Sequence, residues 1–82
     1  TEGDLKRCEF KAHMFKALAH PMRVFMLERL KERPYCVCEL ARAAGIDKSV
    51  ASKHLSQLKE AGLIADEKRG TQVHYRLIAL HP

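Results

Sequence analysis

The segment Pro34-Tyr35-Cys36-Val37-Cys38 places two thiols one residue apart, directly after a proline. Thiolates bind soft metal ions, and thiols are also oxidised to disulfides or sulfenic acids. On a regular helix, residues at this spacing point about 200° apart, so both sulfurs can face one ion only when one lies in an extended segment before the helix. Pro34 favours such a segment, and the dipole of a helix start favours anionic groups. Cys36 and Cys38 are therefore a predicted pair of metal ligands.

The third cysteine, Cys8, lies in an apolar stripe near the start of the chain. Two thiolates need a further donor to enclose an ion, and Cys8 is the only other thiol. It is therefore a candidate third ligand, although a cysteine in an apolar stripe is also an ordinary small hydrophobe. Three sulfurs form a soft site that suits a thiophilic ion better than magnesium, calcium or a four-ligand zinc. The remaining histidines have no metal-ligand spacing among themselves and are interpreted as structural: His13, His20, His74 and His81.

Length and composition limit the protein to one small globular domain, residues 1–82. The 82 residues are 46% hydrophobic and 30% charged, and no apolar run approaches the roughly 20 residues that cross a bilayer. The net charge of +5 favours an anionic partner such as nucleic acid. An odd number of cysteines without a signal-peptide pattern indicates the reducing cytoplasm, where clustered thiols bind metals or sense redox state.

Apolar residues at helical spacing predict four helices. The first carries a stripe of five apolar residues, and the second begins at Pro21 and ends near Pro34 with one buried side. A short third helix, 37–44, is stopped by Gly45, and a fourth, from about 48 to 61, begins after Asp47 and ends at Gly62. The residues on the buried sides are Leu5, Cys8, Ala12, Phe15 and Leu18 in the first helix; Val24, Leu27 and Leu30 in the second; Val37, Leu40, Ala41 and Ala44 in the third; and Ala51, Leu55 and Leu58 in the fourth.

After Gly62 the hydrophobic period changes to that of strands. Apolar residues alternate along 73–79, residues 63–65 can pair with them, and the polar segment 66–72 between them contains glycine and is predicted as the loop of a β-hairpin. Two short helices joined by a glycine turn and followed by this hairpin predict a winged helix-turn-helix, a mainly α fold with a β-hairpin.

The fourth helix has a small, polar and basic face opposite its apolar side. Such a face can approach a DNA major groove closely, and the free N–H groups at the helix start favour a phosphate. Basic residues at the hairpin tip are placed to contact the minor groove or its phosphates. The predicted DNA-binding residues are Lys48, Ser49, Ser52, Lys53, His54 and Ser56 on the helix, and Lys68 and Arg69 on the hairpin. His54 has a second interpretation, in which it packs within the helix-turn-helix.

Together these segments resemble the ArsR/SmtB family of bacterial and archaeal metal-sensing repressors over residues 18–77. ALAHPMRVFMLERL resembles the start of the family's second helix, and YCVCELA resembles its metal-binding box. SVASKHLSQLKEAGLI resembles the recognition-helix signature, and KRGTQVHYRL resembles the wing. The resemblance implies a winged helix-turn-helix that binds double-stranded operator DNA as a homodimer.

The resemblance also implies an inducer. In that family the residues matching Cys36 and Cys38 bind arsenite or antimonite, or cadmium and lead when thiols of an N-terminal segment join them. One type of arsenite sensor has a third cysteine where this sequence has Ala41, which leaves Cys8 as the candidate third thiolate, from the same chain or the other subunit. Arsenite or antimonite is the expected inducer, with cadmium or lead next, and no organic cofactor is expected.

Family members usually dimerise through a C-terminal helix together with the first helix. Here the first helix is expected to dominate.

The resulting hypothesis is a cytoplasmic repressor, neither an enzyme nor a membrane protein, that releases its operator when an ion binds the thiols before the recognition helix. Three alternatives remain open. The cysteines form a redox switch in the same fold, or the chain is a thiol-based metal carrier or thiol enzyme without an operator, or the winged helix binds only other proteins.

Overall fold

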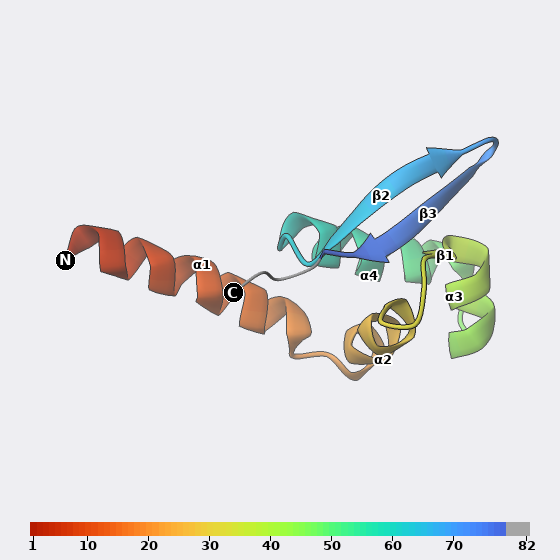
Figure 1. Ribbon diagram of the computed structural model, residues 1–82. Helices are drawn as coiled ribbons and strands as arrows, with labels where there is room; N and C mark the ends of the chain where they lie inside the picture. Colours follow the sequence, from red (N-terminus) through yellow and green to blue (C-terminus); the bar gives the residue numbers. More distant parts are fainter. Residues whose placement is uncertain (79–82) are drawn as a thin grey trace.

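The computed structural model describes residues 1–78, which form a winged helix-turn-helix of four helices and a three-stranded antiparallel sheet (Figure 1). The predicted fold class is confirmed. The sheet order is β1-β3-β2, so the last strand lies between the other two. In chain order the elements are α1 Glu2–Leu18, α2 Pro21–Leu30, β1 Tyr35–Cys36, α3 Val37–Ala44, α4 Lys48–Glu60, β2 Ile64–Arg69 and β3 Gln72–Leu77.

Local capping chemistry determines where the helices begin and end. The Thr1 hydroxyl accepts the Asp4 backbone N–H at the start of α1, and His20 Nδ1 accepts the Met22 N–H at the start of α2, each at 3.2 Å. Gly45 ends α3 in the left-handed conformation, with φ 69°. Gly62, two residues after the end of α4 at Glu60, is also left-handed, with φ 79°. Both predicted glycine stops are confirmed.

The core lies where α2, α3, α4 and the base of the sheet meet. Its fully buried large side chains are Met26, Leu40, Leu55, Leu58 and Ile64. The predicted buried side of α4 is confirmed, but that of α2 is partly wrong, because Val24 is 44% exposed while Met26 is completely buried. α2 carries apolar residues around most of its circumference, so helical spacing alone does not identify the face that packs.

The hairpin of β2 and β3, the wing of the fold, differs from the prediction in two ways. Segment 66–72 is not a long loop, because β2 and β3 pair as far as Arg69 opposite Gln72 and only Gly70 and Thr71 connect them. Gly70 has φ 64°, which a tight two-residue turn requires. The side chains near the hairpin tip are mostly polar, so the sequence there lacks the alternation of apolar and polar residues that identifies a strand. In addition, β1 pairs with β3 and adds a strand that the sequence did not indicate. The predicted end of the second strand at Ala79 lies outside the described residues.

Two parts of the chain extend away from the core. α1 projects to one side and the β2–β3 hairpin projects to the other, so the molecule measures 45 × 24 × 19 Å (Figure 1). Most of the predicted apolar stripe of α1 does not pack within the chain, and of its five residues Leu18 alone packs against the core. Leu5 and Phe15 are 61% and 66% exposed, and Cys8 and Ala12 between them are also exposed. An apolar helix face is therefore left uncovered.

Candidate thiol site and nucleic-acid interface

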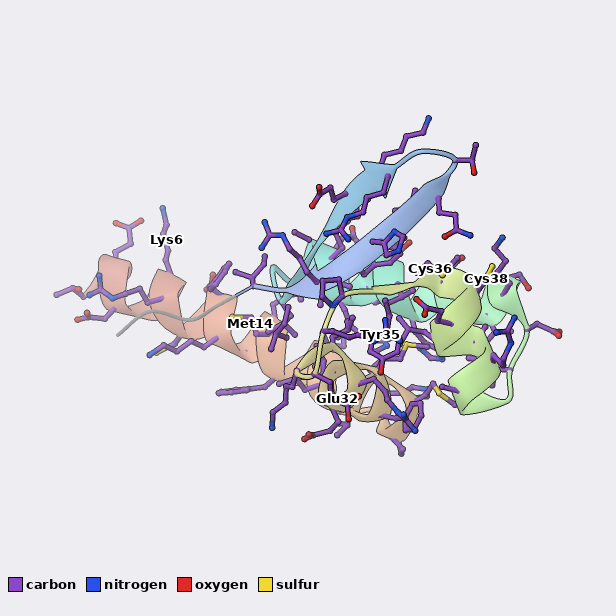
Figure 2. The ribbon with its side chains drawn as sticks, turned by 45° about the vertical axis from the view of Figure 1, so that its right-hand side comes forward. Lys6, Met14, Glu32, Tyr35, Cys36 and Cys38 are labelled. Atoms are coloured by element: carbon purple, nitrogen blue, oxygen red, sulfur yellow. The ribbon has the colours of Figure 1, made fainter. Side chains whose placement is uncertain are left out.

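The two neighbouring thiols lie where β1 passes into α3 (Figure 2). Cys36 ends the strand and caps the helix with extended backbone angles, φ −84° and ψ 163°, whereas Cys38 belongs to the first helical turn. The structure therefore confirms that one residue of the pair is extended and the other helical. Cys36 is only 5% exposed and Cys38 is half-buried, so an ion that binds both must approach from the side of Cys38.

A carboxylate holds this junction in place. The Cys36 backbone N–H donates to Glu39 Oε1 at 3.0 Å, and Arg33 donates to Glu39 Oε2 at 3.2 Å. The backbone hydrogen bond, followed by the Arg33 guanidinium, lowers the pKa of Glu39 to about 2. The Glu39 carboxylate is thus ionised at neutral pH and already has two partners. Any change in the backbone at Cys36 must disturb this bond.

Cys8 does not lie near the other two thiols within one chain. It is exposed on α1, which extends away from α3 (Figure 1). Among residues 1–78, no three histidine, cysteine, aspartate or glutamate side chains gather closely enough to hold an ion. The monomer thus provides a thiol pair, and a third donor must come from a movement within the chain or from another subunit.

The predicted DNA-binding face of α4 lies on the surface opposite the core. Lys48, Ser49, Lys53 and Ser56 are exposed, and Ser52 is half-buried. Asp47 precedes the helix but its side chain forms no capping hydrogen bond, which leaves the N–H groups of the first turn free for an anion. This face has the small, polar and basic side chains that major-groove binding requires.

His54 packs inside the protein, but its partners belong to the start of α2 and not to α3 or α4. Its Nδ1 accepts a hydrogen bond from Arg23 Nε at 3.2 Å, and its ring lies edge-on to that of His20 with 4.5 Å between centroids. Burial, followed by the charges of His20 and Arg23, lowers the pKa of His54. Its role in binding DNA remains a prediction, and a neutral ring offers only its second nitrogen for that contact.

The sequence did not indicate Arg23 as a functional residue. Its guanidinium also donates to the Ala17 carbonyl at 3.3 Å, and it lies between two shallow hollows beside α4. The basic residues that line these hollows are Lys16, Arg23 and Lys53, and no acidic residue lines either one. The basic surface of α4 therefore continues onto α1 and α2. Only the pairing of distant helices creates it, so no local pattern could have revealed it.

At the hairpin tip, Lys68 and Arg69 are both exposed at the end of β2. Arg69 Nε lies 3.8 Å from Glu67 Oε1, a weak surface contact that leaves the guanidinium available. The hairpin projects away from the helical core (Figure 1), and Lys68 and Arg69 belong to the end of β2 next to its tip. Both residues are exposed, and their contact with the minor groove or its phosphates stays a prediction.

Comparison with known proteins agrees with this architecture. Residues 20–66 match the family model described as the bacterial regulatory protein, arsR family. The arsenic resistance transcriptional regulator ArsR1 of Pseudomonas putida is 43% identical over 70 residues, which cover 84% of this chain and 52% of that protein. The arsenical resistance operon repressor of Escherichia coli is 43% identical over 67 residues, covering 78% of this chain and 56% of the repressor. The chain thus spans about half the length of these relatives.

Solved structures resemble the whole described fold. The homodimeric winged helix-turn-helix DNA-binding domain of a possible ArsR-family regulator from Mycobacterium bovis superimposes with a TM-score of 0.89 at 30% identity, covering 94% of this chain and 71% of that one. The transcriptional repressor BigR of Xylella fastidiosa gives 0.80 at 32% identity, covering 96% and 82%.

The fold and the matched residues define a winged helix-turn-helix domain. The chain belongs to the ArsR family of bacterial regulatory proteins. Within residues 1–78, no helix combines the length and apolar character needed to span a bilayer.

Proposed function

We propose that this protein is a metal(loid)-responsive repressor that binds operator DNA as a homodimer and releases it when a thiophilic ion binds Cys36 and Cys38. The observation that carries the proposal is the position of the thiol pair at the start of α3, the helix directly before α4. The family membership and the basic face of α4 support the DNA-binding half of the proposal.

In the DNA complex, α4 of each subunit enters a major groove, and the two grooves are separated by about 34–36 Å along the duplex. The residues proposed to contact DNA are Lys48, Ser49, Ser52, Lys53 and Ser56 on α4 and Lys68 and Arg69 on the hairpin, with His54 supporting the helix. The exposed apolar face of α1 is proposed to form the subunit interface, because burying it removes Leu5 and Phe15 from water.

Release follows from the geometry of the thiol pair. Cys36 is extended whereas Cys38 lies in the first turn of α3, and we propose that one ion that holds both sulfurs distorts that turn. The distortion disturbs the bond between the Cys36 N–H and Glu39, and α3 packs directly on α4. Ion binding and DNA binding are therefore coupled, and the coupling is reciprocal.

The donor set determines which ions fit. Two thiolates with few competing oxygen donors suit arsenite or antimonite best, and cadmium or lead next. Cys8 of the second subunit is a proposed third thiolate. Since Cys8 lies on the uncovered face of α1, dimerisation places it at the interface.

The decisive experiment measures DNA binding and its release. Fluorescence anisotropy of a labelled promoter fragment from the protein's own operon is followed as reduced protein is added and arsenite is then titrated in. We expect nanomolar to micromolar binding at moderate salt and complete release by arsenite. The double variant Cys36→Ser Cys38→Ser is the control. We expect it to bind the fragment normally and to remain bound when arsenite is added.

Three results would contradict the proposal. Release of the double variant by arsenite would exclude the thiol pair as the sensor. Release of the wild type by an oxidant, but by none of arsenite, antimonite, cadmium and lead, would favour the redox switch, and mass spectrometry would then identify the disulfide or sulfenic acid. Failure to bind DNA even at low salt would favour a metal carrier.

A further inference from the structure

One ring nitrogen on the wing has no partner. His74, on β3, has a buried Nδ1 atom that forms no hydrogen bond among residues 1–78. Buried polar atoms are nearly always paired, so an exception calls for an explanation, such as an ion that the atom binds. The histidine spacing in the sequence had suggested a purely structural residue.

The register of the sheet places this histidine beside the thiol site. His74 on the central strand pairs with Cys36 on β1 and with Glu67 on β2. Residues directly opposite each other on antiparallel strands share a face, with Cβ atoms about 4.5–5.5 Å apart. A row of cysteine, histidine and glutamate therefore crosses the sheet at the point where β1 passes into α3.

This row has the chemistry of a metal site with its supporting carboxylate. A neutral imidazole nitrogen and a thiolate bind the same divalent ions, notably zinc and its heavier congener cadmium. A histidine that binds a metal through one ring nitrogen almost always donates its other N–H to a carboxylate or carbonyl. Glu67 is exposed and its only ion-pair contact in the described chain is the 3.8 Å approach of Arg69, so it can accept that N–H.

We propose that, when the thiol site binds cadmium, its third donor is His74 Nδ1 of the same chain as Cys36 and Cys38, in place of Cys8 of the second subunit. This inference rests on the proposed sensing role of those cysteines. No three donors meet in the present conformation, so binding must draw His74 and Cys38 towards Cys36. Such an ion links the start of α3 to β3. Ion binding is therefore expected to shift the β2–β3 wing as well as α4, the proposed recognition helix.

The proposal also separates the candidate inducers. A site of two thiolates and one imidazole selects divalent cadmium, whereas arsenite forms its bonds to thiolates and gains little from the ring. Loss of His74 should therefore weaken cadmium binding and leave arsenite binding nearly unchanged. If Cys8 is the third donor instead, loss of His74 should weaken the binding of neither ion. Loss of Cys8 should then weaken the binding of both arsenite and cadmium, because each loses a thiolate ligand.

The test observes the imidazole directly. Reduced protein labelled with ¹⁵N in histidine is titrated with cadmium chloride, while ultraviolet absorption follows the thiolate-to-cadmium bonds. We expect one equivalent of cadmium to shift the Nδ1 resonance of His74 and no other ring nitrogen comparably. An unchanged His74 resonance, while thiolate absorption develops, would overturn the inference but leave the sensor function intact.

Variants then measure the contribution of the ring. In competition with a chelator, His74→Asn should bind cadmium at least tenfold more weakly than the wild type, with arsenite affinity changed less than threefold. His13→Asn, which alters an exposed histidine on α1, is the matched control and should behave as wild type. Equal cadmium affinity of His74→Asn and wild type would refute the role of His74. If the wild type forms no thiolate–cadmium absorption at all, both the cadmium site and the role of His74 fail.

Discussion

At the scale of single residues, His54 shows how a side chain chosen for DNA contact can be occupied inside the protein. Arg23 donates to its Nδ1 and His20 lies against its ring, so the cluster joins the start of α2 to α4. Burial and the two neighbours lower the pKa of His54 below its ordinary value of 6.5. The recognition helix therefore depends on His54 remaining uncharged.

This dependence predicts that stability falls in mild acid. Between the lowered pKa of folded His54 and about 6.5, the unfolded chain binds more protons than the folded chain, so stability rises with pH. The stability that neutral His54 contributes to the folded state is fully present above pH 6.5, and it is lost as the pH falls towards the pKa of folded His54. We expect the urea midpoint to decrease from pH 7 to pH 5, and to decrease less in His54→Gln. His13→Gln, at an exposed position, should follow the wild type, and an unchanged slope in His54→Gln would refute the argument.

At the scale of elements, the turn between α3 and α4 depends on one glycine. Gly45 has φ 69° and no atom would lie within 4 Å of an added Cβ, so a substitution meets backbone strain and no steric clash. Gly45→Ala should therefore lower the free energy of unfolding by about 1 kcal/mol. Gly3→Ala, within α1, is the control and should be neutral or stabilising by up to about 1 kcal/mol. Urea denaturation measures both, and equal effects would contradict the assigned backbone strain.

The face of α4 allows a second test at this scale. Lys53 is exposed on the DNA side, whereas Lys59 on the same helix pairs with Asp66 at 2.9 Å. If Lys53 neutralises a phosphate, Lys53→Gln should weaken operator binding and reduce the slope of log affinity against log salt by about 1. Lys59→Gln removes the same charge and should leave the slope unchanged. Equal slopes for the two variants would exclude a phosphate contact by Lys53.

The sequence predicted those elements whose signals are local. Gly45 and Gly62 stop helices, and the apolar period of α4 identifies its buried side, because each signal lies within a few residues. β1 has only two residues and therefore no period to detect. The extended backbone of Cys36 was predictable from its spacing to Cys38. Its position opposite His74 was not, because that contact depends on a strand far along the chain.

At the scale of the whole molecule, the elongated shape indicates that the apolar face of α1 is available to pack against another subunit. The radius of gyration is 13.7 Å, whereas a compact chain of this length has about 12 Å. The excess comes from α1, whose 17 residues span about 25 Å and extend past the core. A helix that carries exposed leucine and phenylalanine along such a length gains stability only when a second surface covers it.

This shape predicts that one charge on α1 dissociates the dimer. Phe15→Asp places a carboxylate at the end of the exposed stripe nearest the core, and we expect monomeric protein with weaker operator binding. Lys6→Asp is the control, because nine residues of helix rotate it about 180° to the opposite side. Sedimentation equilibrium measures the association state. A dimer of unchanged strength in Phe15→Asp would mean that another surface joins the subunits.

The pairing of β1 with β3 also has a consequence for how the chain is made. Tyr35 and Tyr75 are partners across the sheet, so their contact closes a loop that contains α3, α4 and β2. Contacts between distant residues form late, because the entropy of closing the loop is lost before the contact is gained. On the ribosome, β1 has no partner until the last strand has emerged. Cys36 and Cys38 of a newly made chain thus remain in an open segment until β3 has been synthesised, and the wing is the element that finally encloses them.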